Sequence, residues 1–153
     1  MKKLLYWTAL LAGCSSDFGT PAQLDRENGF GGVPFGSSPA LLTNATVYSV
    51  QGDDTTFIQD TLRKPDGSFN LTDSLGFAIY WDYKKGKLHK VSASAVGRGI
   101  PAVLEELRRR FGPETVRNDT MYWRGKTVTA TAYCKSVDVD VLLLTVEQKP
   151  QSL

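Results

Sequence analysis

Residues 77–96, FAIYWDYKKGKLHKVSASAV, decide the fold because they predict two β-strands joined by a tight turn. Large apolar side chains recur at every second position in the first half, which is the period of a strand with one apolar face. Residues 84–87 (KKGK) supply the turn, and residues 88–96 return with Ala and Ser on both faces. Small side chains there would let a helix approach the sheet closely. We therefore expect an antiparallel hairpin at these positions.

The clearest helix signal runs from Pro101 to Phe111. Proline suits the first turn of a helix, and Gly112 followed by Pro113 ends it. The helix should be amphipathic because its apolar residues fall at helical spacing, and a run of three arginines in its last turn complements the helix dipole. An i,i+4 ion pair is expected between Glu105 and Arg109. The apolar set is Ile100, Val103, Leu104, Leu107 and Phe111.

Further strands are predicted over residues 44–50, 55–62, 120–124, 126–133 and 137–146. The last of these is strongly apolar and β-branched, so we expect it to lie centrally in the sheet. Many strands with one good helix predict an α+β domain, an antiparallel β-sheet with one main amphipathic helix packed on one face. Such a fold hosts many activities, so it does not settle the function.

The amino-terminal residues have the pattern of an export signal. Lys2 and Lys3 precede a short apolar run over residues 4–11, and the segment ends in Leu11-Ala12-Gly13-Cys14. This tetrapeptide resembles the lipobox of bacterial lipoprotein precursors. The resemblance implies cleavage between Gly13 and Cys14, a diacylglycerol on the Cys14 thiol and an acylated new amino group, which together anchor the chain in a membrane through palmitate-like chains.

Other interpretations of this segment are a transmembrane anchor, a buried helix or an ordinary secretory signal. The apolar run is far shorter than the roughly 20 residues that span a bilayer, and Gly13 with the polar residues 15–17 interrupts a helix. The signal is also shorter than the usual range of about 15–30 residues, so the start codon could lie upstream. Ser15 after the cysteine resembles the outer-membrane sorting pattern of Gram-negative lipoproteins, which implies a periplasm-facing outer-membrane location in such a host.

These signals divide the chain into four parts: a signal peptide over 1–13, a flexible tether over 14–28, a single α+β domain over 29–149 and a frayed end over 150–153. The domain opens with GFGGVPFG at residues 29–36, whose large apolar residues should dock on the core. This opening is similar to that of small uncharacterised bacterial envelope proteins, a resemblance that implies no activity.

Charge and cysteine content exclude several classes of protein. The chain of 153 residues has 18 basic and 16 acidic residues, and loss of Lys2 and Lys3 leaves 16 of each. A neutral domain lacks the basic field that holds nucleic acid, so no nucleic-acid partner is expected. With Cys14 lipidated, Cys134 is unpaired and should be a small buried apolar residue. Without lipidation, a Cys14–Cys134 disulfide is the alternative.

No catalytic set, metal site or cofactor motif is evident. His89 is the only histidine, and zinc would require several His or Cys ligands. We therefore expect a non-catalytic binding or scaffolding module of the bacterial envelope, with a partner surface formed by aromatic residues, half of which should be core. The alternatives are a carboxylate-dependent envelope hydrolase using Asp82 with Glu105 or Asp140, and a periplasmic inhibitor or assembly accessory. The candidate surface residues are Tyr80, Trp81, Tyr83, Tyr122 and Trp123.

Overall fold

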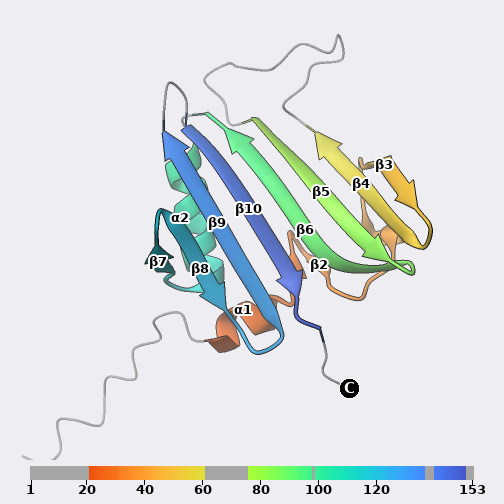
Figure 1. The fold of residues 1–153 in the computed structure, drawn as a ribbon, viewed down its shortest axis with the longest axis horizontal. Helices are drawn as coiled ribbons and strands as arrows, with labels where there is room; N and C mark the ends of the chain where they lie inside the picture. Colours follow the sequence, from red (N-terminus) through yellow and green to blue (C-terminus); the bar gives the residue numbers. More distant parts are fainter. Residues whose placement is uncertain (1–20, 61–75, 98, 137–139, 151–153) are drawn as a thin grey trace, which may run out of the picture.

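Eight antiparallel strands form the main sheet of this protein (Figure 1). The computed structural model describes residues 21–60, 76–97, 99–136 and 140–150. The strand order is β3-β4-β5-β6-β10-β9-β8-β7. The strands are β3 (Thr46–Gln51), β4 (Asp54–Asp60), β5 (Gly76–Lys84), β6 (Lys87–Val96), β7 (Thr115–Arg117), β8 (Thr120–Arg124), β9 (Val128–Ser136) and β10 (Asp140–Gln148).

The sheet consists of two four-stranded meanders that meet along β6 and β10. This seam is antiparallel, and its register places Val146 opposite Val91 and Leu144 opposite Ala93. Each meander follows an α-helix in the chain: α1 (Pro21–Glu27) precedes the first and α2 (Ile100–Phe111) precedes the second. The predicted antiparallel α+β architecture and the central position of the last strand are confirmed, because β10 has a neighbour on each side.

The described residues before the sheet are folded, which corrects the predicted tether over 14–28 from residue 21 onward; residues 14–20 lie outside the described part of the chain. Residues Pro21–Glu27 form α1, whose Leu24 is only 1% exposed in the core. A two-stranded ribbon follows, β1 (Gly29–Phe30) with β2 (Val33–Pro34), and then a 3₁₀ turn η1 (Pro39–Leu41). A seven-residue helix with one buried leucine is too short to show a periodic apolar pattern, so sequence reasoning predicts a loop there.

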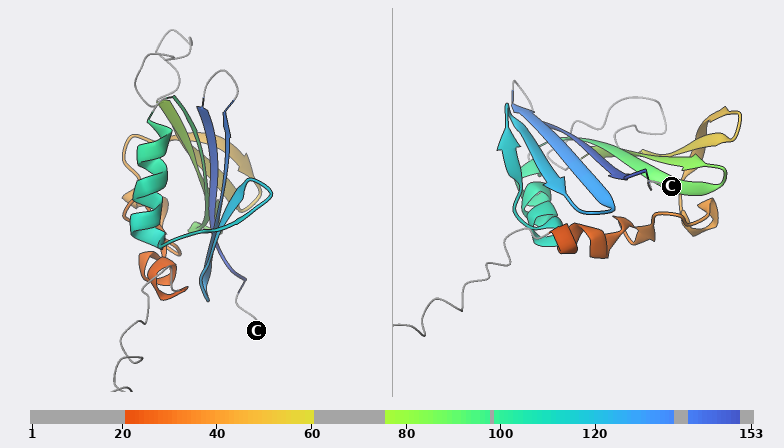
Figure 2. Two further views of the ribbon diagram at one scale, coloured as in Figure 1. Left: turned by 90° about the vertical axis from the view of Figure 1, so that its left-hand side faces the viewer. Right: turned by 60° about the horizontal axis from the view of Figure 1, so that its bottom comes forward.

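Helix α2 begins at Ile100, one residue before the predicted start, and both α-helices lie on the same side of the sheet (Figure 2). Ile100, Leu107 and Phe111 are the α2 residues that are buried in the core. The rings of Phe111 and Trp123 are 5.8 Å apart in an edge-on arrangement. The indole Nε1 of Trp123 donates a 2.7 Å hydrogen bond to the carbonyl of Gly112, directly after the helix. The aromatic contact and this hydrogen bond join the carboxyl end of α2 to β8, while Ile100 is buried at its amino end.

The arginines of α2 pair differently from the expected i,i+4 arrangement. Glu106 rather than Glu105 is the partner of Arg109, and it also accepts a hydrogen bond from Arg110; both ion pairs are 2.6 Å long. Arg108 instead pairs with Glu114 beyond the helix. Glu106 is within one helical turn of both arginines, which is why it binds them together.

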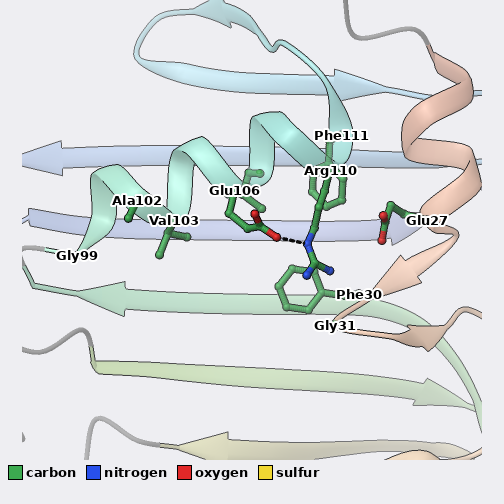
Figure 3. Close-up of a pocket in the computed structure, with 10 residues that line it drawn as sticks. Glu27, Phe30, Gly31, Gly99, Ala102, Val103, Glu106, Arg110 and Phe111 are labelled. Carbon is green, nitrogen blue, oxygen red and sulfur yellow. Dashed lines mark hydrogen bonds and ion pairs between the residues drawn. The ribbon is translucent and has the colours of Figure 1, made fainter.

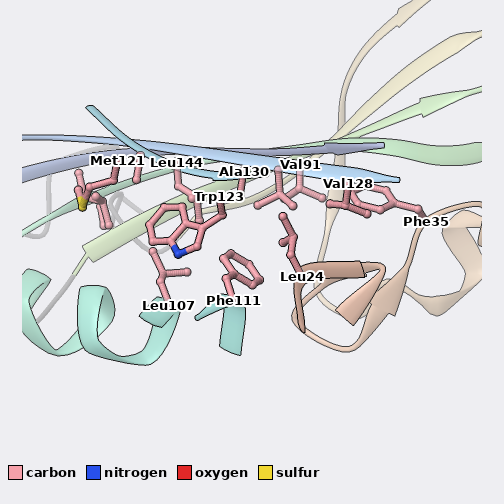
Figure 4. Packing of buried hydrophobic residues seen from close by; sticks show 14 of the residues in the cluster. Leu24, Phe35, Val91, Leu107, Phe111, Met121, Trp123, Val128, Ala130 and Leu144 are labelled. Carbon is pink, nitrogen blue, oxygen red and sulfur yellow. The ribbon is translucent and has the colours of Figure 1, made fainter. Parts of the chain in front are cut away.

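The core lies between the sheet and the helices (Figure 4). Its largest fully buried side chains are Tyr83, Leu24, Leu88, Ile100, Leu142, Val91, Val128 and Val146.

Within the described residues, no helix has the length and apolar character needed to cross a membrane. The predicted signal, its cleavage site at Gly13 and Cys14, and residues 15–20 lie outside the described part of the chain.

Candidate binding surfaces

The aromatic surface predicted from the sequence is divided between the two faces of the sheet. Trp81, Tyr83 and Trp123 are 3%, 1% and 3% exposed and belong to the core, so they form no partner surface. Tyr80 and Tyr122 lie on the opposite face and are half-buried. The correction follows from strand geometry, because neighbouring residues of one strand point to opposite faces.

The face of the sheet turned away from α2 has two central rows of uncharged side chains. Residues opposite one another in neighbouring strands share a face, so the register defines both rows. We call these ten residues the open face. They are Tyr80, Ser92, Thr145, Thr131 and Tyr122 in one row, and Ala78, Ser94, Leu143, Tyr133 and Thr120 in the next. Ala78, at the β5 end of the second row, is itself buried.

Charged side chains border the open face. The adjacent row across the sheet consists of Asp82, Lys90, Glu147, Thr129 and Arg124. At this border the Arg124 guanidinium lies over the ring of Tyr122, 5.6 Å from its centre. Leu143 and Tyr133 are 51% and 38% exposed in the middle of the uncharged rows. The open face therefore has an apolar and hydroxyl centre with a charged margin along one edge.

A second candidate site is an apolar cleft on the helix side, and it has two compartments. The outer cavity, about 540 Å³, lies between α2 and the β1 turn (Figure 3). The inner cavity, about 180 Å³, lies between α2 and the strands β5, β6 and β10. Phe30, Val103 and Leu107 line both compartments. The two cavities are thus neighbouring parts of one cleft.

The inner cavity has an entirely apolar wall. Its sheet side is formed by six residues, two from each of three strands: Phe77, Ile79, Ala93, Ala95, Leu142 and Leu144. The alanines of β6 were expected to let a helix approach closely, but here they form the floor of a cavity beneath α2. The sequence shows that these residues are small but not whether another side chain fills the space above them.

Arginines gather at the mouth of the cleft. A shallow polar depression of about 390 Å³ adjoins the outer cavity and is lined by Gln23, Arg26, Glu27, Arg109 and Arg110. Glu106, on the wall of the outer cavity, accepts hydrogen bonds from Arg109 and Arg110, which lower its pKa to about 2. Arg26 has no ion-pair partner among the described residues.

The acidic residues of the hydrolase alternative do not converge. Asp82 lies at the charged margin on the side of the sheet away from α2 and accepts a hydrogen bond from Thr56. Glu105 is an exposed residue of α2 on the other side, and Asp140 starts β10 at the opposite end of the strands. Neither of the two suggested pairs is therefore a catalytic dyad in this fold.

Among the described residues, no group of three or more His, Cys, Asp or Glu side chains is arranged to hold a metal ion. His89 is half-buried in β6. Cys134 is a free thiol that packs partly against the core rather than within it. Desolvation, with a smaller contribution from the Asp140 charge, raises the pKa of Cys134.

Comparison with known proteins found no matching family model, no matching curated protein and no matching solved structure.

Proposed function

We propose that this protein is a lipid-anchored lipoprotein of the bacterial envelope that binds another envelope protein through its open face and performs no catalysis. The observation that carries the proposal is the pair of uncharged rows centred on Leu143 and Tyr133, which lie on the sheet surface away from α2. In this proposal α2 serves as the covering layer of the other face, and the open face is the side that meets the partner.

The composition of the open face supports a protein partner. Interface centres are depleted in charged residues and enriched in tyrosine, while their rims are polar. Tyrosine offers a large contact area with few rotatable bonds and a hydroxyl that hydrogen-bonds at the edge of a contact. Three tyrosines lie among the ten residues of the open face, and the charged row with Arg124 forms its margin.

The dimensions are sufficient for a stable complex. Strands lie about 4.8 Å apart and rise about 3.3 Å per residue, so a sheet of this width and length offers roughly 1,000 Å² on one face. A standard interface buries about 800 Å² on each partner. Most of this sheet face would therefore be needed to hold a partner of standard size.

The anchor follows from the resemblance of residues 11–14 to a lipobox. A single acyl chain gives only marginal membrane binding, and two or more hold a protein stably. A lipid-modified Cys14 would keep the folded part at a membrane surface, in a Gram-negative host on the periplasmic side of the outer membrane. A periplasmic inhibitor and an assembly accessory would both use an open face of this kind.

Site-specific photo-cross-linking in the native host tests the binding surface. We expect a benzophenone amino acid at Leu143 or Tyr133 to yield one discrete adduct. The matched control is the same group at Leu41, which is 56% exposed on η1 and not part of the open face. A Tyr122→Arg substitution should abolish the adduct from position 143. Equal adducts from positions 41 and 143, or none from the open face, would contradict the proposal.

The anchor is tested separately. Labelled palmitate should be incorporated into the wild-type chain and not into Cys14→Ser, which should leave the membrane fraction. Mass spectrometry that finds an intact amino-terminal methionine and an unmodified Cys14 thiol in the native protein would refute the anchor without affecting the cross-linking result.

A further inference from the structure

We propose that the apolar cleft beneath α2 binds a single-chain amphiphile, with the end of its hydrocarbon chain in the inner cavity, the rest of the chain in the outer cavity and its anionic head group at the arginines of the mouth. This site is on the opposite side of the sheet from the open face, so the inference goes beyond the proposed function and stands independently of it.

The inner cavity selects hydrocarbon. All nine side chains that line it are apolar, so a bound group receives no hydrogen bond there. Burying a polar group without a partner is costly, which excludes sugars, nucleotides and peptide backbone from this compartment. An acyl chain carries no such group and gains free energy with every methylene it removes from water. The lining is thus suited to a chain and to little else.

The outer cavity provides the path from solvent to the inner cavity. Its wall includes residues that reach the surface, among them Gly31 and Ala102, and it shares Phe30 with the inner cavity. Phe30 is half-buried, and its ring centre is 6.1 Å from that of Trp81. Both cavities together have the size of small-molecule pockets, which enclose roughly 300–1,000 Å³. A chain that enters beside Phe30 would extend under α2.

The mouth selects a negative charge. Arg26, Arg109 and Arg110 lie around the polar depression, while Glu27 and Glu106 are the acidic residues there. The Nε–H of Arg110 donates a hydrogen bond to Glu106, so one side of this guanidinium is already occupied (Figure 3). A guanidinium has five N–H donors, so Arg110 keeps donors for a ligand, and Arg26 uses none in an ion pair with a described residue. Carboxylate and phosphate both fit this fork-like donor geometry.

The ligand chemistry is therefore an acyl chain with an anionic head, whether the source is a free fatty acid or a lysophospholipid. The test uses the full-length Cys14→Ser chain, so that no acyl group of the protein itself occupies the cleft. Equilibrium dialysis with labelled dodecanoate, dodecyl phosphate and the uncharged dodecanol measures binding. We expect saturable binding of one equivalent of each anion, and binding about tenfold weaker for the alcohol. Tighter binding of dodecyl phosphate would point to the phospholipid source, and tighter binding of dodecanoate to the fatty acid.

Two kinds of variant separate the chain site from the head-group site. Ala93→Leu fills the inner cavity from the sheet and Val103→Phe fills it from the helix; each should abolish binding while thermal unfolding stays cooperative. Arg26→Gln should weaken binding of the anions about tenfold and leave that of dodecanol unchanged, whereas Arg117→Gln on β7 is the matched control and should change neither.

Three results would overturn the inference. They are the absence of saturable binding of either anion by the folded Cys14→Ser chain, undiminished binding in both filled-cavity variants, and equal affinities for the anions and the alcohol that Arg26→Gln does not alter. A variant that does not unfold cooperatively is not used to judge binding. In that case the other cavity-filling variant, Ala93→Leu on the sheet or Val103→Phe on the helix, decides the question. None of these outcomes depends on the cross-linking at Leu143.

Discussion

Asp25 and Thr127, 102 residues apart in the chain, are joined by two hydrogen bonds: the backbone N–H and the side-chain hydroxyl of Thr127 both donate to Oδ1 of Asp25 at 2.9 Å. The same carboxylate accepts the N–H groups of Lys126 and Val128. One side chain of α1 thus caps the turn between β8 and β9. It fixes the first described helix to the second meander.

Replacing Asp25 with Asn should destabilise the fold by roughly 1–2 kcal/mol. The backbone N–H groups of the turn then lose a charged acceptor with two oxygens and have a single neutral amide oxygen in its place. Chemical denaturation measures the loss. The control is Glu27→Gln on the same helix, an exposed change that should have little effect. Equal stability of Asp25→Asn and wild type would show that the cap contributes nothing.

The cap also predicts a dependence on pH. Partial burial raises the pKa of Asp25, but the hydrogen bonds from Thr127, Lys126 and Val128 lower it by more, so the folded-state pKa lies below the ordinary value. The stabilisation should be complete above the unfolded-state pKa of about 3.9 and should decline as the pH falls through the lower folded-state value. Stability measured against pH should lose this slope in Asp25→Asn.

Gly125 is required beside the cap. A Cβ atom there would collide with the Asp25 carboxylate and lie 2.9 Å from the carbonyl oxygen of Val128. Gly125→Ala should therefore destabilise the wild type more than it destabilises Asp25→Ala, where one of the two obstacles is gone. A double-mutant cycle by denaturation measures this coupling, and strict additivity would contradict it.

The carboxyl group of Glu106 should titrate at about 2, since side-chain hydrogen bonds from Arg109 and Arg110 favour its charged form. NMR titration of the side-chain carboxyl checks this value. Arg109→Gln with Arg110→Gln should move the pKa towards 4.5, and added salt should raise it in the wild type by screening. A pKa that ignores both changes would mean that the ion pairs do not form in solution.

Tyr83→Phe should change stability by less than about 0.5 kcal/mol or increase it, because its buried hydroxyl has no hydrogen-bond partner in the described part of the chain. The neighbouring hydroxyl of Ser37, which offsets part of the rise that burial causes in the Tyr83 pKa, donates its own proton to the carbonyl of Pro34. Trp123→Phe, the comparison, should cost roughly 2–3 kcal/mol since it removes both volume and the hydrogen bond to Gly112. Thermal or chemical unfolding ranks the two, and a larger loss for Tyr83→Phe would reveal a partner of the hydroxyl.

The thiol of Cys134 should react slowly with iodoacetamide at pH 8. Desolvation and the charge of Asp140 raise its pKa, so little of the reactive thiolate is present. The Cys14→Ser chain isolates this thiol, and the same chain in guanidinium chloride is the control that should react quickly. Equal rates in the folded and denatured chains would contradict the protected environment.

Sequence reasoning predicted the elements whose apolar periodicity and end signals all lie within the element itself. The alternation of residues 77–83 and the period and stop signals of residues 101–113 determine their structure locally. Helix α1 and strand β7 have no such pattern, because α1 depends on Leu24 meeting the core and on Asp25 meeting a turn a hundred residues away. Only the fold reveals those contacts.

The candidate sites show the same division. Tyr80 and Tyr122 could be named as surface residues, but the alternation of β5 and β8 places Trp81, Tyr83 and Trp123 in the core, and the sequence does not say which face is covered. The open face became recognisable only when register aligned Leu143 with Tyr133. Likewise, no sequence pattern marks Ala93 or Leu142 as lining a cavity. The cavity exists because α2 leaves a space between itself and these residues of the sheet.

The seam between β6 and β10 has a consequence for assembly. All other strand pairs lie within one meander or the other. Within the sheet, only the pairing of β6 with β10 joins the two meanders. Gly97 directly follows β6 at the end of the first half and has a φ of 125°, a region that glycine enters freely, so we take Gly97 as the hinge between the halves. If this hinge straightens at high protein concentration, the second half of one molecule can dock on the first half of another and re-form every seam hydrogen bond. Exchange of halves between copies would thus produce a domain-swapped dimer whose sheets are indistinguishable from those of the monomer.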